Sequence, residues 1–383
     1  MMLAPPSVLG FLLLGTAARA QQVPEPVPWV EVDVPTVAGG HYVDWIDLVS
    51  VSDDSYVACY QLIGDRLTRI ATNVVRSTDA GRTWQRVQSF TDVQDATLAW
   101  DGKTAWLIAA TEYGNPVVLR ALDAAVSSFS DPVEIRGSDG LIATESTIVH
   151  AGRVWRAFRR SLIPACSETR EQVLVASAEL GTDLQDPASW RWSGELPSNC
   201  IGASGYGSPM RFVGGGEGAL KLTIERADEP QPRSILELSE DGWRLRVDRE
   251  PNPWKHLPAL AGRFQRNGRN GYFYATGIES SDAGASGLET PANVLTLVRS
   301  HDLETWQSPV LLHDESEKPM QFGNSTVRVL GEDLGVLFAF RTDRRKDVHA
   351  GSLGQSALAF LRVPKFTDKK TSDPPLWGPA LPR

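Results

Sequence analysis

The sequence predicts an all-β fold, a six-bladed β-propeller of four-stranded antiparallel blades in which an N-terminal strand closes the sixth blade. Apolar residues almost nowhere repeat with the 3.6-residue period of a helix over three turns. Short β-branched and aromatic runs alternate instead with clusters of Gly, Asp, Asn and Pro. These runs recur as a four-strand unit, and six units of about 45 to 60 residues fill most of the 383-residue chain.

The predicted strands follow one another in register with this unit. In the first three units they cover residues 46–51, 56–62, 70–77 and 84–90; 97–100, 105–111, 117–122 and 132–135; and 147–150, 154–158, 172–178 and 190–196. In the fourth and fifth they cover 210–213, 219–225, 234–238 and 243–247, then 263–265, 272–277, 294–300 and 306–312. Dipeptides such as Asp101-Gly102 and Asn270-Gly271 suit the tight hairpins between them.

The sixth unit shows only three strands, at 326–330, 336–341 and 357–363. Residues 29–34 alternate like a strand and have no other partner. We therefore expect this N-terminal segment to complete the sixth blade, because closing the ring in this way also hides two sheet edges.

Composition excludes several classes of protein. The chain is 42% apolar, 8% aromatic and 22% charged, which excludes a disordered or fibrous protein. Its 38 Lys and Arg against 47 Asp and Glu give a net charge of -9 without a basic stripe, so we expect no nucleic-acid partner. The six His and three Cys lack metal-ligand spacing. We expect no metal, no cofactor and a monomer.

The two ends of the chain differ from the repeating part. Residues 8–14 are apolar and precede Ala18-Arg19-Ala20, a small-x-small cleavage signal, so 1–20 reads as a signal peptide. We expect a secreted or periplasmic protein with no membrane span after cleavage, because no later apolar segment reaches the roughly 20 residues needed. The propeller would cover 21–366, and 367–383, rich in Lys, Asp and Pro, would form a loose tail.

An oxidising compartment allows one disulfide among the three cysteines. Cys166 and Cys200 both lie in loop-like sequence, whereas Cys59 lies inside an apolar strand pattern. We favour a Cys166–Cys200 bond, and separate reduced thiols are the alternative.

A turn motif recurs between the third and fourth predicted strands of several units. Residues 77–84 read STDAGRTW and fit the pattern Ser-x-Asp-x-Gly-x-x-Trp. The carboxylate of Asp79 can accept N–H bonds of the turn, Gly81 supplies a permissive backbone, and Trp84 can pack between sheets. Residues 300–306 repeat the pattern with Glu in place of Gly, 239–243 shorten it and 177–190 expand it.

With these Asp-box turns (BNR repeats) and six units, the chain resembles the sialidase (neuraminidase) superfamily over residues 30–366. It is closer to uncharacterised bacterial sialidase-family proteins than to true sialidases, and residues 112–114, 152–158 and 296–306 carry that likeness. The resemblance implies a six-bladed propeller that acts on a carbohydrate. A propeller that acquired such turns independently is the alternative.

Repeat geometry points to one end of the propeller as the site. The first strand of each blade starts, and the second ends, at the same mouth, opposite the Asp-box turns. Carboxylates, arginines and a tyrosine gathered there suit general acid–base work on a glycosidic bond. The catalytic candidates are Glu112, Asp44, Tyr113 and Glu145, and the substrate-binding candidates are Arg159, Arg226, Arg263, Arg341, Asp95 and Asn324. Asp47 also falls at the mouth in this scheme; the alternative for any one of these residues is a turn cap or a solvated side chain.

Sialic acid makes a further demand. The superfamily's sialidases hold the substrate carboxylate with three arginines, the first in a Tyr/Phe-Arg-Ile-Pro-like motif of the opening blade. This chain has no Arg or Lys between residues 21 and 65. We therefore expect a glycoside hydrolase that acts on another sugar, with a non-catalytic glycan- or protein-binding propeller as the alternative.

Overall fold

The computed structural model describes residues 28–35, 41–64, 68–136, 141–161, 171–193, 210–214, 220–225, 232–239, 242–251, 259–266, 273–280, 292–300, 310–314, 321–341 and 356–363. Within them, all regular structure is strand except one 3-10 turn, Pro187–Ser189. The predicted signal peptide, the tail, Cys166, Cys200 and Arg226 lie outside the described residues. No helix among the described residues is long and apolar enough to cross a membrane.

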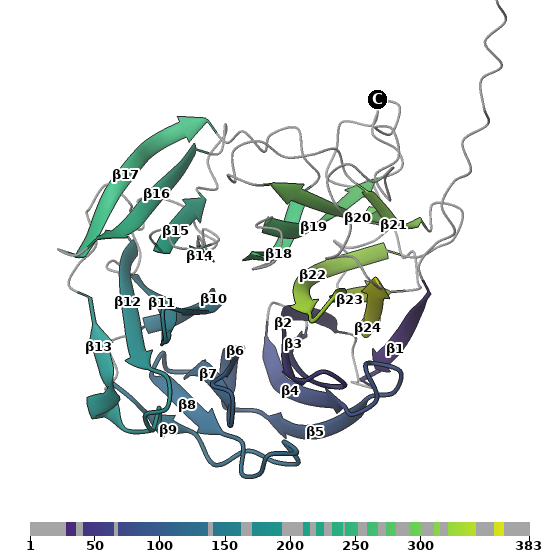
Figure 1. Ribbon diagram of the computed structural model, residues 1–383, viewed down its shortest axis with the longest axis horizontal. Coiled ribbons are helices and arrows are strands. Elements are labelled where there is room, and N and C mark those ends of the chain that lie inside the picture. Colours follow the sequence, from purple (N-terminus) through teal and green to yellow (C-terminus); the bar gives the residue numbers. More distant parts are fainter. Residues whose placement is uncertain are drawn as a thin grey trace, which may run out of the picture.

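The strands of the described residues form six four-stranded antiparallel sheets, arranged radially as Figure 1 shows. The first three sheets contain β2 Tyr42–Ser52, β3 Ser55–Ile63, β4 Arg69–Ser77 and β5 Gln85–Phe90; β6 Val93–Trp100, β7 Ala105–Thr111, β8 Pro116–Arg120 and β9 Val133–Glu134; and β10 Leu141–His150, β11 Arg153–Ser161, β12 Glu171–Glu179 and β13 Trp190–Trp192. The fourth and fifth contain β14 Met210–Gly214, β15 Leu220–Glu225, β16 Pro232–Ser239 and β17 Gly242–Pro251; and β18 Ala259–Arg266, β19 Phe273–Ser280, β20 Ala292–Ser300 and β21 Val310–Asp314. The sixth contains β22 Gln321–Leu330, β23 Asp333–Arg341, β24 Ser356–Val363 and β1 Trp29–Asp33.

The innermost strands contact one another in the order β2, β6, β10, β14, β18, β22 and back to β2, so the sheets close into a ring. The predicted all-β propeller of four-stranded antiparallel sheets is confirmed, and the described residues contain six such sheets.

The N-terminal strand closes the ring as predicted. β1 pairs antiparallel with β24, with Trp29 opposite Leu361. The Trp29 ring packs edge-on against Phe340 of the sixth sheet at 4.8 Å, and its Nε1 donates to His313 of the fifth at 3.3 Å. At the other end of β1, Arg86 of the first sheet binds both carboxylate oxygens of Asp33 at 2.7 and 2.9 Å. β1 therefore ties three sheets together.

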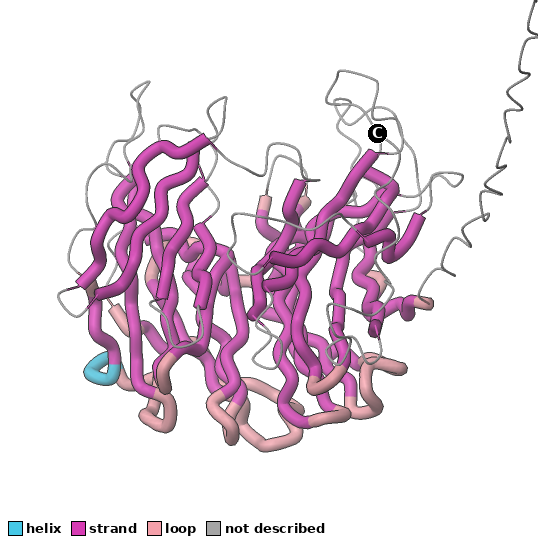
Figure 2. Tube along the Cα trace, turned by 45° about the horizontal axis from the view of Figure 1, so that its top comes forward, coloured by secondary structure: helices cyan, strands magenta, loops and turns pink. Residues whose placement is uncertain are grey.

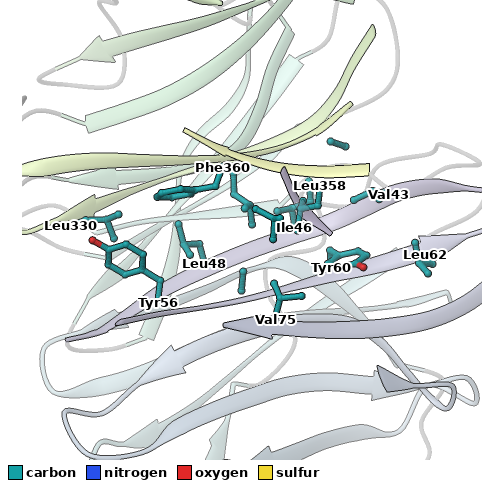
Figure 3. Close-up of a cluster of buried hydrophobic side chains, with 14 of the residues drawn as sticks. Val43, Ile46, Leu48, Tyr56, Tyr60, Leu62, Val75, Leu330, Leu358 and Phe360 are labelled. Atoms are coloured by element: carbon teal, nitrogen blue, oxygen red, sulfur yellow. The ribbon is translucent and has the colours of Figure 1, made fainter. Parts of the chain in front are cut away.

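The apolar core lies between neighbouring sheets and is not gathered at one centre. Figure 3 shows the cluster between the first and sixth sheets, where Leu48 and Tyr56 meet Leu358 and Phe360. Similar clusters join the first sheet to the second, the second to the third and the fifth to the sixth. Each sheet is thus buried mainly by its two neighbours, as expected for radially packed sheets.

The 77–84 turn has the predicted chemistry. The carboxylate of Asp79 accepts bonds from the Thr83 N–H at 2.9 Å and the Thr83 hydroxyl at 2.6 Å. These bonds lower the pKa of Asp79 to about 2. Gly81 adopts φ +85°, and Trp84 packs against Phe360 of the last sheet at 5.3 Å. The expanded motif at residues 177–190 ends with a similar bond: Trp190 Nε1 donates to the Leu184 carbonyl, as Trp84 Nε1 donates to the Gly81 carbonyl.

A β-bulge near the start of the innermost strand recurs in five of the six sheets. The register against the second strand shifts between residues 44 and 47, 94 and 97, 143 and 147, 261 and 265, and 322 and 325. Two bulges hold a non-glycine residue in the left-handed region, Trp45 at φ +49° and Asp95 at φ +53°. Such conformations are costly for non-glycine residues and concentrate at functional sites.

In four of these five sheets the structure describes the side chain of the first residue after the bulge, and there it is polar and buried; we call these residues, Asp47, Thr97, Thr147 and Ser325, the polar belt. Each member reaches a neighbouring sheet. Asp47 accepts the Leu98 N–H at 2.6 Å, the hydroxyls of Thr97 and Thr147 meet at 2.5 Å, and Ser325 donates to Thr276 at 2.8 Å. The belt thus satisfies polar groups around the axis.

The mouth position expected for Asp47 is wrong. Its carboxylate is fully buried and binds the Arg328 guanidinium at 2.6 Å, so it is a structural ion pair between the first and sixth sheets. The prediction failed because the innermost strand begins before the bulge, at Tyr42, and Asp47 lies well inside it.

Candidate functional site

Three strand boundaries of each sheet meet at the same end of the ring. In the first sheet, Tyr42 at the start of β2 pairs with Ile63 at the end of β3, which pairs with Arg69 at the start of β4. The 77–84 turn follows β4 at the opposite end. Figure 2 shows the strands running between these two ends. We call the first the strand-start end.

Asp44 and Asn324, both predicted site residues, meet at the strand-start end. Asn324 Nδ2 donates to Asp44 Oδ1, joining the sixth sheet to the first across 280 residues of sequence. The same oxygen accepts the N–H of Trp45 at 2.8 Å, within the bulge. Asp44 is half-buried and Asn324 is exposed, so this pair is accessible from solvent.

Asp95, the third predicted residue here, lies in the bulge of β6. Its carboxylate is fully buried and stands 3.1 Å from Arg69 Nη2 of the first sheet. Arg69 also donates to Gln94 and keeps 30% of its side chain exposed. The buried Asp95 carboxylate thus holds the Arg69 guanidinium in place. Of the two side chains, only that of Arg69 is exposed at the strand-start end.

Gln61 connects Asp44 to Asp95. Asp44 and Gln61 are cross-strand partners in β2 and β3, and Gln61 Oε1 accepts the Asp95 N–H at 3.1 Å. The two acidic residues therefore lie on neighbouring sheets with one side chain between them.

Tyr42 lies near the Asp44 carboxylate and the Arg69 guanidinium. Burial raises the pKa of Tyr42 to about 12; the nearby Asp44 carboxylate adds to the rise and the Arg69 guanidinium opposes it. At neutral pH its hydroxyl is protonated and can donate a hydrogen bond. We call Tyr42, Asp44, Arg69, Asp95 and Asn324 the start-end cluster.

Sequence reasoning missed Tyr42 and Arg69. Tyr42 lies two residues before Asp44, on the same face of β2, since side chains of a strand alternate. Arg69 begins a third strand, whereas the prediction rests on first-strand starts and second-strand ends alone. The hairpin connection between second and third strands returns the chain to this end, which is the signal that finds Arg69. The opening sheet therefore does bring one guanidinium to this end of the ring.

Glu112 and Tyr113 lie in the tight turn between β7 and β8, also at the strand-start end. The turn is closed by Gly114 N–H donating to Thr111 O at 3.0 Å, with Gly114 at φ +79°. Both side chains are exposed, Tyr113 to 75%, and the neighbouring Glu112 carboxylate raises the pKa of Tyr113. No hydrogen bond or ion pair given for the described residues links them to the start-end cluster, and their catalytic role stays a prediction.

The remaining candidates are placed by their backbone. Glu145 and Arg263 lie in the bulges of β10 and β18, and Arg159 lies near the end of β11; their side chains are outside the described part of the structure. Arg341 ends β23, half-buried and opposite Gln321. Among the described residues, no three His, Cys, Asp or Glu side chains gather as metal ligands would.

Comparison with known proteins shows that solved structures share the fold of this chain. No family model and no curated protein matches the sequence. A Dyadobacter fermentans protein of unknown function superposes with a TM-score of 0.56 at 13% identity, covering 89% of this chain and 100% of that one. Trypanosoma rangeli sialidase in complex with sialic acid superposes at 0.55 and 15% identity; 88% of this chain is covered, but only 58% of the sialidase. Penicillium chrysogenum α-L-arabinanase with arabinobiose superposes at 0.52 and 12% identity, covering 88% and 98%. The chain thus has the propeller fold found in sialidases and an arabinanase.

Proposed function

We propose that the protein is an exported glycoside hydrolase that acts on a sugar other than sialic acid at the strand-start end. The observation that carries the proposal is the start-end cluster, whose residues come from three sheets and which contains an accessible Asp44–Asn324 pair, a neutral tyrosine and an arginine held by Asp95. Such donors and acceptors suit a hydroxyl-rich ligand. Structural neighbours that carry the same fold, a sialidase and an arabinanase, act on sugars.

In this proposal Asp44 is one of the two carboxylates that act at the glycosidic bond, since it is accessible and is oriented by Asn324 and the Trp45 N–H. Glu112, exposed on the adjacent sheet, is the second carboxylate that glycoside hydrolysis requires, with Tyr113 beside it. Arg69, Arg341 and Asn324 would bind sugar hydroxyls. A separation of about 5 Å between the carboxylates would give retention, and one of about 6.5–9.5 Å inversion.

Sialic acid fits this arrangement poorly. The guanidinium that the opening sheet supplies is already paired with Asp95 at 3.1 Å, and a sialoside carboxylate near Asp44 would meet a like charge. Each missing charge-assisted bond weakens binding by about 1.5–3 kcal/mol. We expect no hydrolysis of 4-methylumbelliferyl sialic acid. Robust turnover that Arg69→Ala or Arg341→Ala abolishes would restore a sialidase.

The test is a screen of the purified chain against aryl glycosides and native glycans, followed by Asp44→Asn. Loss of a general acid–base group should lower kcat about 10²- to 10⁴-fold while the melting temperature stays unchanged. Asp54→Asn, an exposed residue in the turn between β2 and β3 at the other end, is the matched control and should keep full activity.

Two outcomes would contradict hydrolysis. Glycan binding without turnover, with affinity unchanged in Asp44→Asn, would indicate a non-catalytic glycan-binding propeller. Absence of both binding and turnover across the screen would remove the carbohydrate proposal altogether.

A further inference from the structure

Arg156 occupies a position that is apolar in other sheets. It lies in β11 opposite Thr147, the first residue after the β10 bulge. The corresponding positions of the other four bulged sheets hold Cys59, Ile108, Tyr274 and Phe338. All five side chains are fully buried. Sheets of this fold therefore form without a charge at this position, and a buried guanidinium is costly unless it is paired or hydrogen-bonded.

The bonds of Arg156 converge on the bulge of the neighbouring sheet. Nη2 donates to the Asp95 carbonyl at 2.5 Å. Nη1 donates to Thr147 at 3.1 Å and to Thr97, two members of the polar belt. The guanidinium thus reaches from the third sheet to the second and hydrogen-bonds to the backbone of Asp95.

Asp95, which Arg156 binds, has an unusual backbone conformation and forms an ion pair. Asp95 adopts φ +53°, a left-handed conformation that is uncommon for non-glycine residues, although Asp adopts it more readily than most. In that conformation its carboxylate stands 3.1 Å from Arg69, and Gln61 accepts its N–H. Arg156 supplies the third fixed contact, on the carbonyl, so both polar groups of the Asp95 backbone are held.

We propose that Arg156 is a positioning residue, which holds the Asp95 bulge so that Asp95 in turn fixes the Arg69 guanidinium at the strand-start end for a sugar ligand. The assignment rests on the proposed function and names the support of its binding arginine. Arg156, buried and bonded to Asp95 and the belt, contacts no ligand itself.

The test replaces Arg156 by the kind of residue the other sheets carry. Arg156→Met should still fold, with a melting temperature lowered by a few degrees, because the Asp95 carbonyl loses a buried donor while the Thr97 and Thr147 hydroxyls can still bond each other. Its dissociation constant for the glycan found in the screen should rise about 10- to 100-fold, by isothermal titration calorimetry. Arg153→Met, on the same strand with its ion pair to Glu179 near the opposite end, is the matched control and should bind normally.

A double-mutant cycle separates positioning from general damage. In an Arg69→Gln background, Arg156→Met should cause no further loss, because its effect passes through Arg69. An equal loss in both backgrounds, or an unchanged dissociation constant, would overturn the assignment. If Arg156→Met does not fold, Arg156→Lys gives the same comparison, since an ammonium keeps the charge but lacks the planar fork that reaches all three oxygens.

A readout without ligand separates this inference from the proposed function. Crystal structures of the wild type and Arg156→Met should show Asp95 leaving the left-handed region and Arg69 moving away in the variant. An unchanged Asp95 and Arg69 would contradict the positioning role even if glycan binding is real. A wild type that binds no glycan would instead defeat the proposed function, and the crystallographic comparison would still decide the role of Arg156.

Discussion

The two ends of the first sheet use similar polar residues in different ways. In the 77–84 turn, Asp79 finds its partners within four residues, and the turn satisfies its own N–H groups. At the strand-start end, Asp44 bonds Asn324 across 280 residues, and Arg69 reaches Asp95 on the next sheet. Because these hydrogen bonds stay within the turn, they stabilise the local structure of that end. Left-handed non-glycine residues occur at both ends, since Ala80 in the turn adopts φ +62°. The difference is that the partners at the second end come from three sheets, and we therefore favour that end for the proposed function.

Removal of the closing strand should have the largest effect on stability. Deleting residues 21–34 exposes β24 and removes both the Trp29 packing and the Asp33–Arg86 ion pair. We expect a loss of more than about 5 kcal/mol, since the partly buried Trp29, the buried Val32, the ion pair and the hydrogen-bonded partner of β24 are all lost together. Thermal unfolding and solubility check it, and a truncated chain that unfolds at the full-length temperature would show that the ring does not depend on β1.

Breaking the polar belt should come next. Asp47→Ala leaves Arg328 and the Leu98 N–H without their buried carboxylate, and should cost about 3–5 kcal/mol in urea unfolding. Asp92→Ala, an exposed carboxylate, should change stability by less than about 0.5 kcal/mol. Equal effects of the two substitutions would mean that the belt does not hold the sheets.

The turn end can be probed by a pair of glycines. Gly81→Ala combines φ +85° with a Cβ only 2.3 Å from Phe360 Cε1, and should cost about 2–4 kcal/mol. Gly102→Ala has φ +95° with nothing within 4 Å, and should cost about 1–2 kcal/mol. Equal losses in chemical denaturation would show that packing between the turn and the last sheet does not matter.

The smallest effect is expected for Asp79→Ala, at about 1 kcal/mol, because its carboxylate is exposed and partly screened. The folded pKa of about 2 lies below the ordinary aspartate value of 3.8, so the stabilisation by Asp79 is present above about pH 4 and is lost as the pH falls toward 2. The difference between wild-type and variant stability should therefore shrink over that window. A difference independent of pH would exclude the charged acceptor as its cause, and any loss of glycan affinity would place this turn in the site.

The bulges decided how well the strands could be predicted. Where the innermost strand carries a bulge, its predicted start came four to six residues late: residues 46, 97, 147, 263 and 326 against observed starts at Tyr42, Val93, Leu141, Ala259 and Gln321. The strand without a shift, β14, starts at 210 as predicted. An extra residue breaks the two-residue alternation on which strand prediction depends.

Non-local contacts also limited how much of the candidate site could be predicted from the sequence. The 77–84 turn could be predicted because its bonds are local. Asp44, Asp95 and Asn324 were found from their place in the repeat, whereas Arg69 and Tyr42 needed the third strand and the true start of β2. Arg156 was beyond reach because its sequence context matches the apolar core positions of other sheets, and only the fold brings it to Asp95.

The most direct measurement is a crystal structure of the protein with the sugar that the screen identifies, solved with an Asp44→Asn variant that binds without turnover. The account predicts the sugar at the strand-start end, in contact with residue 44, Asn324 and Arg69, with Asp95 still left-handed behind Arg69. A sugar bound at the turn end beside Asp79, or away from Arg69, would contradict it.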